Sequence, residues 1–304
     1  MHILVTGSTG LAGSALIPAL TADGHRVSRL VRTKLNLENR DHYWDPTSNE
    51  LYSPSLEGLD AVIHLAGESI AGGRWTAARK ARIRDSRVQG TRLLSQSLAK
   101  LARPPRVFVS ASAIGFYGDR ADEILTEESS PGSNFLAGVC REWESAAAPA
   151  AQHGIRVVPL RFGMVLSAKG GALAKMLTPF RMGVGGVVGN GKQYMSWIAI
   201  DDLVSVIIHA LKTNSLEGPV NAVAPNPVTN AEFTKALGRA LRRPTIFPMP
   251  AFAARLAFGE MADELLLASA RVVPTKLQAS GFEFRHPNIE SAFTSLLAEP
   301  SRRS

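Results

Sequence analysis

Runs of aliphatic and β-branched residues alternate with longer stretches of helical apolar spacing through the first half of the chain. The strand-like runs lie at residues 2–6, 26–31, 60–66, 107–110 and 155–160, and the helix-like stretches at 11–23, 85–101 and 135–152. The run 60–66 is nearly all apolar, which is expected for a strand covered on both faces. Because strands that alternate with helices form βαβ units, the pattern predicts a parallel sheet with helices on its faces.

The second half of the chain has a different pattern. Glycine and short apolar runs fill residues 163–199, and helical spacing returns at 229–241 and 251–270, with Pro244, Pro248 and Pro250 between them. We predict an α/β fold of the doubly wound Rossmann type with a smaller C-terminal substrate lobe. The Rossmann domain is expected to comprise residues 1–165 and a returning segment at about 192–225, and the lobe to comprise 166–191 and 226–304.

Composition excludes several classes of protein. The chain has 304 residues, of which 45% are hydrophobic and 20% charged, as in ordinary globular proteins. A single cysteine rules out an intrachain disulfide, and no apolar run is long enough to span a membrane. No signal peptide is evident, so a cytoplasmic protein is expected. The net charge of +8 fits a solvated basic surface or an attraction to anionic ligands, but the dispersed basic residues do not predict nucleic-acid binding.

The segment GSTGLAG follows the first predicted strand and opens the first predicted helix. It places Gly7, Gly10 and Gly13 where a backbone without Cβ atoms lets a pyrophosphate approach the N–H groups of a helix N-terminus. This strand–turn–helix context favours a dinucleotide site over a plain glycine turn. The predicted contacts are Gly7, Ser8, Thr9, Gly10 and Leu11.

The adenosine ribose is expected to lie about 20 residues past the last glycine, after the second strand. An NAD site carries Asp or Glu there, but this chain has Arg32 and no acid before Glu38. A guanidinium suits a 2′-phosphate because it forms forked, charge-assisted hydrogen bonds. We therefore predict NADP(H) in preference to NAD(H), with Arg29 and Lys34 as further candidates for the phosphate and a surface arginine as the alternative interpretation.

Four further motifs resemble those of the extended short-chain dehydrogenases/reductases. They are HLAG at 64–67, VQGTRLL at 88–94, SASAIGFYG at 110–118 and SWIAIDDL at 196–203. Segments such as FLAGVCREWE, RFGMVLSAKGGAL and GEMADELLLASARVVPTKLQASGFEF resemble, more closely, an atypical, sugar-nucleotide-epimerase-like branch with a C-terminal domain of unknown function. This resemblance spans nearly the whole chain and implies a Rossmann fold with an NAD(P) cofactor.

The resemblance also implies positions for the rest of the cofactor site. Beyond the glycine turn and Arg32, it implies contacts with Leu65, Ala66, Gly67, Glu68, Arg87, Ser110, Ala111 and Arg161. Ser112 matches the serine that orients the substrate oxygen in the family, with Ser110 as the alternative. No metal is expected. The implied partner is a small-molecule substrate, with a phosphate-bearing or nucleotide-sugar compound as the candidate class, and a homodimer is left open.

The family's catalytic Tyr-x-x-x-Lys pair is missing. Aligning on Glu144 puts Leu136 at the tyrosine and Cys140 at the lysine, and no lysine occurs between Lys100 and Lys169. A tyrosine of lowered pKa, which moves a proton during hydride transfer, therefore has no equivalent here.

Three residues are weak candidates to replace that pair. Tyr117 has a structural alternative, Cys140 is a nucleophile only if its thiolate is stabilised, and Glu68 is an acid or base only if it faces the nicotinamide. His64 lies within an apolar strand and is interpreted as a core residue.

Two segments are expected to border the substrate. The basic stretch 74–87 is either a solvated amphipathic helix or the source of a pocket-lining Trp75, and the loop 183–197 is expected to form the mouth of the pocket, with Gln193, Met195, Ser196 and Trp197. Packing between the lobes is the alternative for Trp197. Two functions follow: an NADP-dependent oxidoreductase or epimerase-like enzyme with an unusual proton carrier, or a catalytically silent NADP(H)-binding sensor or regulator.

Overall fold

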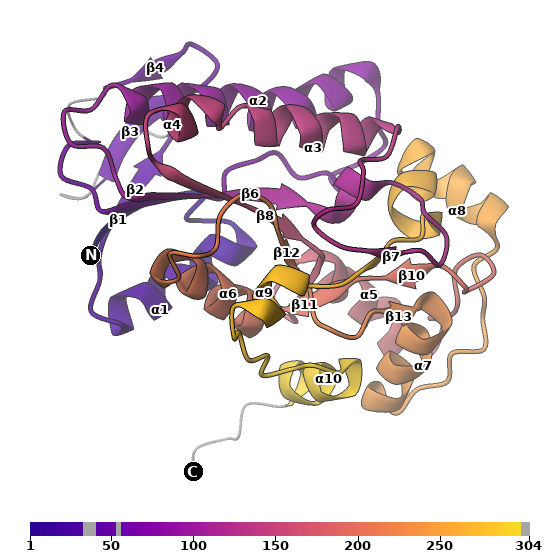
Figure 1. Cartoon of the computed structure of the whole chain (residues 1–304). Helices are drawn as coiled ribbons and strands as arrows, with labels where there is room; N and C mark the ends of the chain where they lie inside the picture. Colours follow the sequence, from indigo (N-terminus) through magenta and orange to yellow (C-terminus); the bar gives the residue numbers. More distant parts are fainter. Residues whose placement is uncertain (33–40, 53–55, 299–304) are drawn as a thin grey trace.

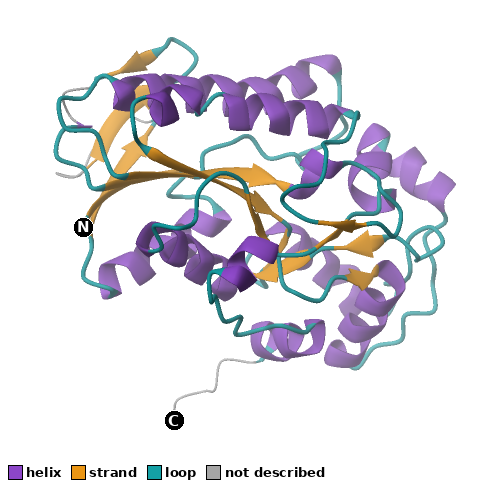
Figure 2. Cartoon of the chain, in the orientation of Figure 1, coloured by secondary structure: helices purple, strands orange, loops and turns teal. Residues whose placement is uncertain are grey.

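A computed structural model describes residues 1–32, 41–52 and 56–298. Its centre is an eight-stranded sheet (Figures 1 and 2) of order β12-β8-β6-β5-β1-β2-β3-β4. The strands are β1 (His2–Thr6), β2 (Arg26–Val31), β3 (Asp41–Asp45), β4 (Glu50–Leu51), β5 (Ala61–His64), β6 (Val107–Ala113), β8 (Arg156–Phe162) and β12 (Val220–Ala222). All neighbours pair in parallel except β3 and β4, so the predicted parallel sheet is confirmed.

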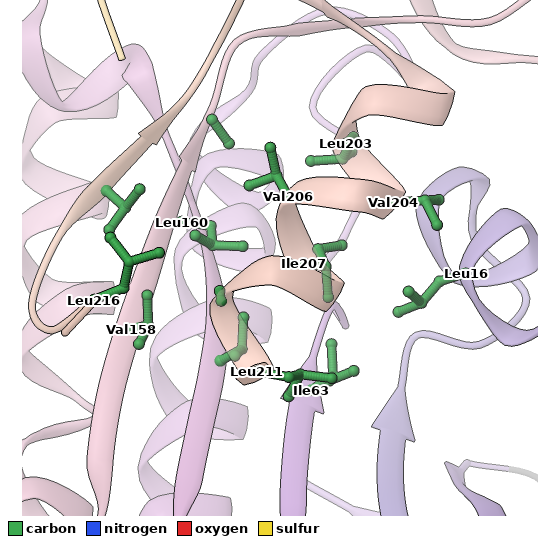
Figure 3. Packing of buried hydrophobic residues seen from close by; sticks show 14 of the residues in the cluster. Leu16, Ile63, Val158, Leu160, Leu203, Val204, Val206, Ile207, Leu211 and Leu216 are labelled. Carbon is green, nitrogen blue, oxygen red and sulfur yellow. The ribbon is translucent and has the colours of Figure 1, made fainter. Parts of the chain in front are cut away.

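Helices cover both faces of this sheet. Figure 1 shows α2 (Ala77–Ala99), α3 (Phe135–Ser145) and α4 (Ala148–Gln152) on one face, and α1 (Leu11–Ala22) and α6 (Ile200–Lys212) on the other. Figure 3 shows the core on the second face, where Leu16 of α1 and Ile207 of α6 lie near Ile63 of β5. The predicted Rossmann-type doubly wound fold is confirmed.

A smaller group of elements packs beside the carboxyl ends of the central strands. It contains α5 (Gly171–Arg181), α7 (Asn230–Leu241), α8 (Ala251–Phe258), α9 (Thr275–Ala279) and α10 (Ile289–Leu297), with β7 (Ile124–Leu125), β9 (Met164–Leu166), β10 (Tyr194–Met195), β11 (Trp197–Ala199), β13 (Val228–Thr229) and β14 (Arg271–Val272). Its apolar core includes Leu173, Trp197, Phe233 and Phe293. The alternative interpretation of Trp197 as a packing residue is therefore the one the structure supports.

Two predicted helices are interrupted. The stretch 135–152 divides into α3 and α4 at Pro149, which has no N–H to continue the helix. Ser95 of α2 bridges the break, donating to the Ala147 carbonyl at 3.1 Å and accepting from the Ala150 N–H at 2.9 Å. The stretch 251–270 ends its α-helix at Gly259, whose φ of 62° lies in the left-handed region, and continues as a π-helical turn, Ala262–Leu267.

Two other predicted boundaries were also wrong. The helix expected at 85–101 begins at Ala77, where the Thr76 side chain accepts a hydrogen bond from the Arg79 N–H as an N-cap. The basic stretch 74–87 is thus largely the first part of α2. The strand expected at 60–66 ends at His64, because the Thr6 hydroxyl accepts hydrogen bonds from the next two N–H groups, those of Leu65 and Ala66.

The path of the sheet sets a topological switch point. From β1 the chain builds outward through β2 and β3, and it then returns to place β5 on the opposite side of β1. In open α/β sheets, ligands bind where the strand order reverses in this way, outside the carboxyl ends of the strands. Across the described ranges, no helix is both long and apolar enough to cross a membrane.

Candidate functional site

The glycine turn after β1 lies against the loop after β5. Gly7 has a φ of 67°, and a Cβ atom there would lie 2.6 Å from the carbonyl carbon of Leu65 and 2.8 Å from the nitrogen of Ala66. A Cβ atom on Gly13 would overlap the Gly7 carbonyl oxygen. Both glycines are therefore required by the folded backbone itself.

Gly10 differs from the other two glycines. Its φ of −74° suits any residue, and a Cβ atom would meet only the Gly7 oxygen at 3.3 Å. Gly10 is the N-cap of α1, where no side chain caps the helix and no acidic residue lies in the first turn. Gly10 and Thr9 are exposed, while Ser8 is buried. The helix N-terminus is therefore open to an anion from outside.

His64 is a core residue, as expected. Its ring nitrogens lie 2.7 Å from the Thr6 hydroxyl and 3.0 Å from the Thr91 hydroxyl. Burial lowers its pKa to about 4, so the ring is neutral. The Trp143 indole of α3 also donates to the Thr91 hydroxyl, at 2.9 Å. These hydrogen bonds connect β1, β5, α2 and α3 beneath the loop that follows β5.

Arg87 of α2 lies directly under the backbone of Gly67 and Glu68. Its Nη1 donates to the carbonyl oxygens of Glu68 and Ile83, both at 3.0 Å. A Cβ atom on Gly67 would lie 3.4 Å from the Arg87 guanidinium carbon, and the guanidinium lies 5.1 Å from the centre of the Trp143 ring. Burial lowers the pKa of Arg87. A fixed cation therefore lies at the carboxyl end of β5.

Ser112 is buried at the end of β6 and is bonded to α3. Its hydroxyl donates to Glu144 Oε1 at 2.6 Å. Arg161 of β8 lies opposite Ser112 in the sheet and donates to both oxygens of the same carboxylate, at 2.8 and 2.9 Å. The hydroxyl expected to orient a substrate oxygen is thus held by a carboxylate that is only 12% exposed.

The same arginine extends the network to Tyr117. Arg161 Nη1 donates to the tyrosine hydroxyl at 2.9 Å, and that hydroxyl donates to Asn221 Oδ1 at 2.7 Å. The guanidinium also lies 3.5 Å from the centre of the Phe116 ring. Burial raises the pKa of Tyr117. The geometry favours the structural interpretation of Tyr117 over a proton-carrying role, because its hydroxyl is fully buried and bonded on both sides.

Helix α3 carries Leu136 and Cys140, the residues that the sequence comparison predicts at the family's tyrosine and lysine positions, and both are buried. Burial and the nearby Glu144 carboxylate raise the pKa of Cys140 to about 12. This environment opposes the thiolate that a nucleophilic role for Cys140 requires. The Glu264 carboxylate, from the C-terminal region, accepts the first N–H groups of α3, from Phe135 at 3.1 Å and Leu136 at 3.0 Å.

The segment after β5 reaches across to the C-terminal region. The Trp75 ring packs edge-on against Phe135 with 5.4 Å between centroids, and Lys80 lies 4.4 Å from the centre of the Phe135 ring. Lys80 also pairs with Glu260 at 2.6 Å. The Glu68 carboxylate lies 4.0 Å from Arg79, on the same segment. The residues around Trp75, the start of α3 and the start of the π-helical turn therefore converge.

The three basic candidates for the adenosine phosphate differ in position. Arg29 lies inside β2 and makes a two-bond ion pair with Asp41 of β3, at 2.7 Å for each bond, so it is already committed to a carboxylate. Arg32 is exposed just past the end of β2. Lys34 lies outside the described residues.

Two of the residues expected at the pocket mouth in the loop 183–197, Gln193 and Ser196, are bonded to backbone carbonyls. Gln193 donates to the carbonyls of Val188 and Leu266, both at 3.0 Å, and Ser196 donates to the Ala270 carbonyl at 2.8 Å. Both side chains are buried, because their short polar groups satisfy backbone carbonyls at the joint with the C-terminal region.

Several residues of the network were missed by sequence reasoning. Glu144 served only to align the helix, and Asn221 and Glu264 were not considered. Isolated acids and amides are usually solvent-facing, so spacing alone gave no signal that these three side chains bond within the fold. Only the arginine in LRFG, inside an otherwise apolar strand, indicated that a buried counter-ion was needed.

Comparison with protein-family models places this site in a known class. Residues 3–223 match the NAD dependent epimerase/dehydratase family, and residues 249–296 match a domain of unknown function, DUF1731. The chain belongs to the NAD dependent epimerase/dehydratase family. The resemblance to an epimerase-like branch with such a C-terminal domain is confirmed.

Curated relatives share the whole length of the chain. An epimerase family protein of Mycobacterium leprae is 42% identical over 301 residues, covering 99% of this chain and 97% of its own. The human epimerase family protein SDR39U1 is 36% identical over 301 residues, covering 98% of this chain and 100% of its own. Both are similar to this chain in both regions, including the C-terminal one.

Solved structures show the same fold. The crystal structure of human SDR39U1 with NADPH has a TM-score of 0.89 at 33% identity and covers 97% of this chain and 99% of its own. A nucleoside-diphosphate sugar epimerase of Corynebacterium glutamicum has a TM-score of 0.82 at 40% identity and covers 98% of this chain and 58% of its own. UDP-glucose 4-epimerase of Thermotoga maritima, at 19% identity and a TM-score of 0.74, shares the fold.

Proposed function

We propose that this chain binds NADPH across the carboxyl ends of β1, β5 and β6. The observation that carries the proposal is the uncapped N-terminus of α1 behind Gly10, next to the close approach of Gly7 to Leu65. The human relative crystallised with NADPH supports it. The proposed contacts are Gly7, Ser8, Thr9, Gly10, Leu11, Leu65, Ala66, Gly67, Glu68, Ser110 and Ala111.

Arg32 is proposed to select the phosphorylated cofactor. It is exposed at the end of β2, the strand next to β1, and Arg29 is paired with Asp41. A free guanidinium there favours a 2′-phosphate through charge-assisted hydrogen bonds. NADP(H) is therefore expected to bind more tightly than NAD(H).

At the other end of the proposed site, Arg87 and Ser112 have different roles. Arg87 fixes the Gly67–Glu68 backbone through its hydrogen bond to the Glu68 carbonyl and holds a positive charge beside the nicotinamide half of the cofactor. Ser112, held by Glu144, positions the end of β6 beside that half. Arg161 acts through Glu144 as a positioning residue. The nicotinamide, when bound, supplies hydride chemistry.

The proposed activity is that of an NADP(H)-dependent oxidoreductase or epimerase-like enzyme on a small molecule. The basic segment 74–87 favours an anionic substrate, and a phosphate-bearing or nucleotide-sugar compound is the candidate class from family analogy. Leu136 and Cys140 cannot carry a proton as a tyrosine–lysine pair does, so this activity uses another proton path.

One set of observations favours a second function. The Ser112 and Tyr117 hydroxyls are both engaged in a buried network, which is the arrangement expected of a cofactor-binding sensor or regulator without turnover.

The test has two stages. NADPH and NADH binding are first measured by fluorescence titration. Oxidation of NADPH and reduction of NADP are then followed at the nicotinamide absorbance with carbonyl, alcohol and sugar-nucleotide panels, with Ser112→Ala beside the natural chain. Turnover that Ser112→Ala slows supports the enzyme. Tight NADPH binding without turnover on any of these panels or on quinones supports the sensor, and absence of NADPH binding contradicts both.

A further inference from the structure

The groups that usually protonate a reduced carbonyl are all engaged at this site. The Tyr117 hydroxyl is fully buried and donates to Asn221, and the Ser112 hydroxyl donates to Glu144. His64 is fully buried between two threonine hydroxyls. Cys140 is buried in α3, and the Glu68 side chain lies 4.0 Å from Arg79. The Lys80 ammonium, beside the start of α3, donates to Glu260 at 2.6 Å. Among the residues that the structure describes, each of these proton donors at the ends of β5 and β6 and the start of α3 is therefore already engaged.

This arrangement limits which hydride acceptors are chemically reasonable. Hydride addition to a simple ketone leaves an alkoxide, which is strongly basic and needs a proton or strong hydrogen-bond donors as it forms. Hydride addition to a quinone leaves a hydroquinone anion instead. That anion is delocalised and has a phenol-like pKa of about 10, as for a tyrosine side chain, so water completes its protonation.

The side chains that surround the start of α3 suit a flat aromatic acceptor. The half-buried rings of Trp75 and Phe135 lie edge to face, and the Trp75 indole is fixed by its hydrogen bond to the Ile70 carbonyl at 2.8 Å. Lys80 lies 4.4 Å from the centre of the Phe135 ring. Leu136, which replaces the family's tyrosine, is apolar. Aromatic and apolar surface with nearby cations favours a ring that becomes an anion.

Resting on the proposed NADPH site, we propose that the hydride acceptor is a quinone-type ring, reduced without a proton from the protein. NADPH gives a hydride, with two electrons, to the quinone, which becomes the hydroquinone anion. Solvent supplies one proton, and the products are NADP⁺ and the hydroquinone. The NADPH is oxidised and the quinone is reduced.

A matched pair of acceptors tests this proposal. The full chain with NADPH is given 2,3-dimethoxy-5-methyl-1,4-benzoquinone or cyclohexane-1,4-dione, which has the same ring size and two carbonyls but yields an alkoxide. A blank without protein is subtracted. We expect kcat/KM for the quinone to exceed that for the dione by at least about a hundredfold, and the hydride-transfer rate to be flat from pH 6 to 9.

Variants locate the acceptor. Trp75→Leu is expected to raise KM for the quinone about fivefold with NADPH binding unchanged, because one aromatic contact is lost. Phe247→Leu, on the linker before α8 and 56% exposed, is the control and should change neither value. The unchanged NADPH titration also shows that each variant is folded.

The outcomes separate the two proposals. Tight NADPH binding with no quinone reduction, or with the dione reduced as fast as the quinone, overturns the quinone proposal alone. A hydride-transfer rate that follows a titrating group also overturns it, since an acid of the protein is then involved. Failure to bind NADPH removes the proposed function, and the quinone proposal with it.

Discussion

The Glu144 carboxylate on α3 accepts two hydrogen bonds from the Arg161 guanidinium on β8, at 2.8 and 2.9 Å. The exposed fractions of the two side chains are only 12% and 3%, respectively. The same carboxylate holds the Ser112 hydroxyl, so one ion pair fixes the helix and the strand end that border the proposed nicotinamide site.

Removing one charge of this pair is expected to be costly. Glu144→Gln leaves the Arg161 cation buried without a full counter-charge, so the free energy of unfolding should fall by about 3 kcal/mol. The measurement is urea unfolding at neutral pH. Glu142→Gln is the control on the same helix, because Glu142 pairs with Arg84 at the surface and should cost less than about 1 kcal/mol. Equal effects of the two variants would contradict the importance of the buried pair.

Gly10→Ala separates cofactor binding from folding. The new methyl group is tolerated by the backbone, whose nearest atom to it lies at 3.3 Å, but it occupies the approach to the N-terminus of α1. NADPH affinity is expected to fall more than tenfold, which corresponds to a loss of about 1.4 kcal/mol or more of binding free energy. The free energy of unfolding should change little. Titration of NADPH fluorescence measures the affinity.

Gly138→Ala in α3 is the matched control, because a Cβ atom there meets nothing within 4 Å. It should stabilise the chain by about 0.5–1 kcal/mol without changing NADPH affinity, since alanine favours a helix. If the Gly10→Ala protein binds NADPH with normal affinity, the proposal that the pyrophosphate lies at this turn is contradicted.

Arg32→Glu is expected to weaken NADPH binding far more than NADH binding. A charge-assisted hydrogen bond is worth about 1.5–3 kcal/mol, so NADPH affinity should fall by about 10- to 100-fold while NADH affinity changes little. Arg26→Glu, at the opposite end of β2, is the control for altered surface charge. Parallel losses of both cofactors in Arg32→Glu would exclude the 2′-phosphate contact.

The lowered pKa of His64 is expected to make the free energy of unfolding depend on pH. Its pKa is lowered from 6.5 to about 4 in the folded chain, so the unfolded chain takes up a proton first as pH falls. The stabilising contribution is complete above pH 6.5 and is lost on acidification toward pH 4. Between pH 7.5 and 5, we expect the free energy of unfolding to fall by about 2 kcal/mol more in the natural chain than in the His64→Gln variant. Parallel urea-unfolding curves for both proteins across this range would show that His64 is not responsible.

Cys140 is expected to be unreactive in the native chain. Its side chain is buried and its pKa is raised to about 12, so very little thiolate is present at pH 8. An aromatic disulfide reagent should therefore release no thiol signal from the folded protein, and one equivalent per chain after denaturation in urea. Fast modification of the folded protein would contradict this prediction and would make Cys140 a candidate nucleophile.

The sequence by itself determined the fold class and the position of the glycine turn that is proposed to bind the dinucleotide. Both depend on local chemistry: apolar runs of strand length alternate with helical spacing, and Gly7 and Gly13 occupy positions where a Cβ atom would collide with neighbouring backbone. Such constraints act within a few residues or repeat with a fixed period, so they are visible along the chain. The predicted absence of a tyrosine–lysine pair depends on the same kind of local spacing.

Only the tertiary structure decided what surrounds that turn. Glu144 meets Arg161, and Glu264 meets the start of α3, across separations in sequence that no spacing rule connects. The burial of Trp197 depends on the packing of the C-terminal region. Local secondary-structure propensities contribute less free energy than buried charges and side-chain packing do. These tertiary contacts, rather than the local pattern, therefore set which groups remain free for chemistry.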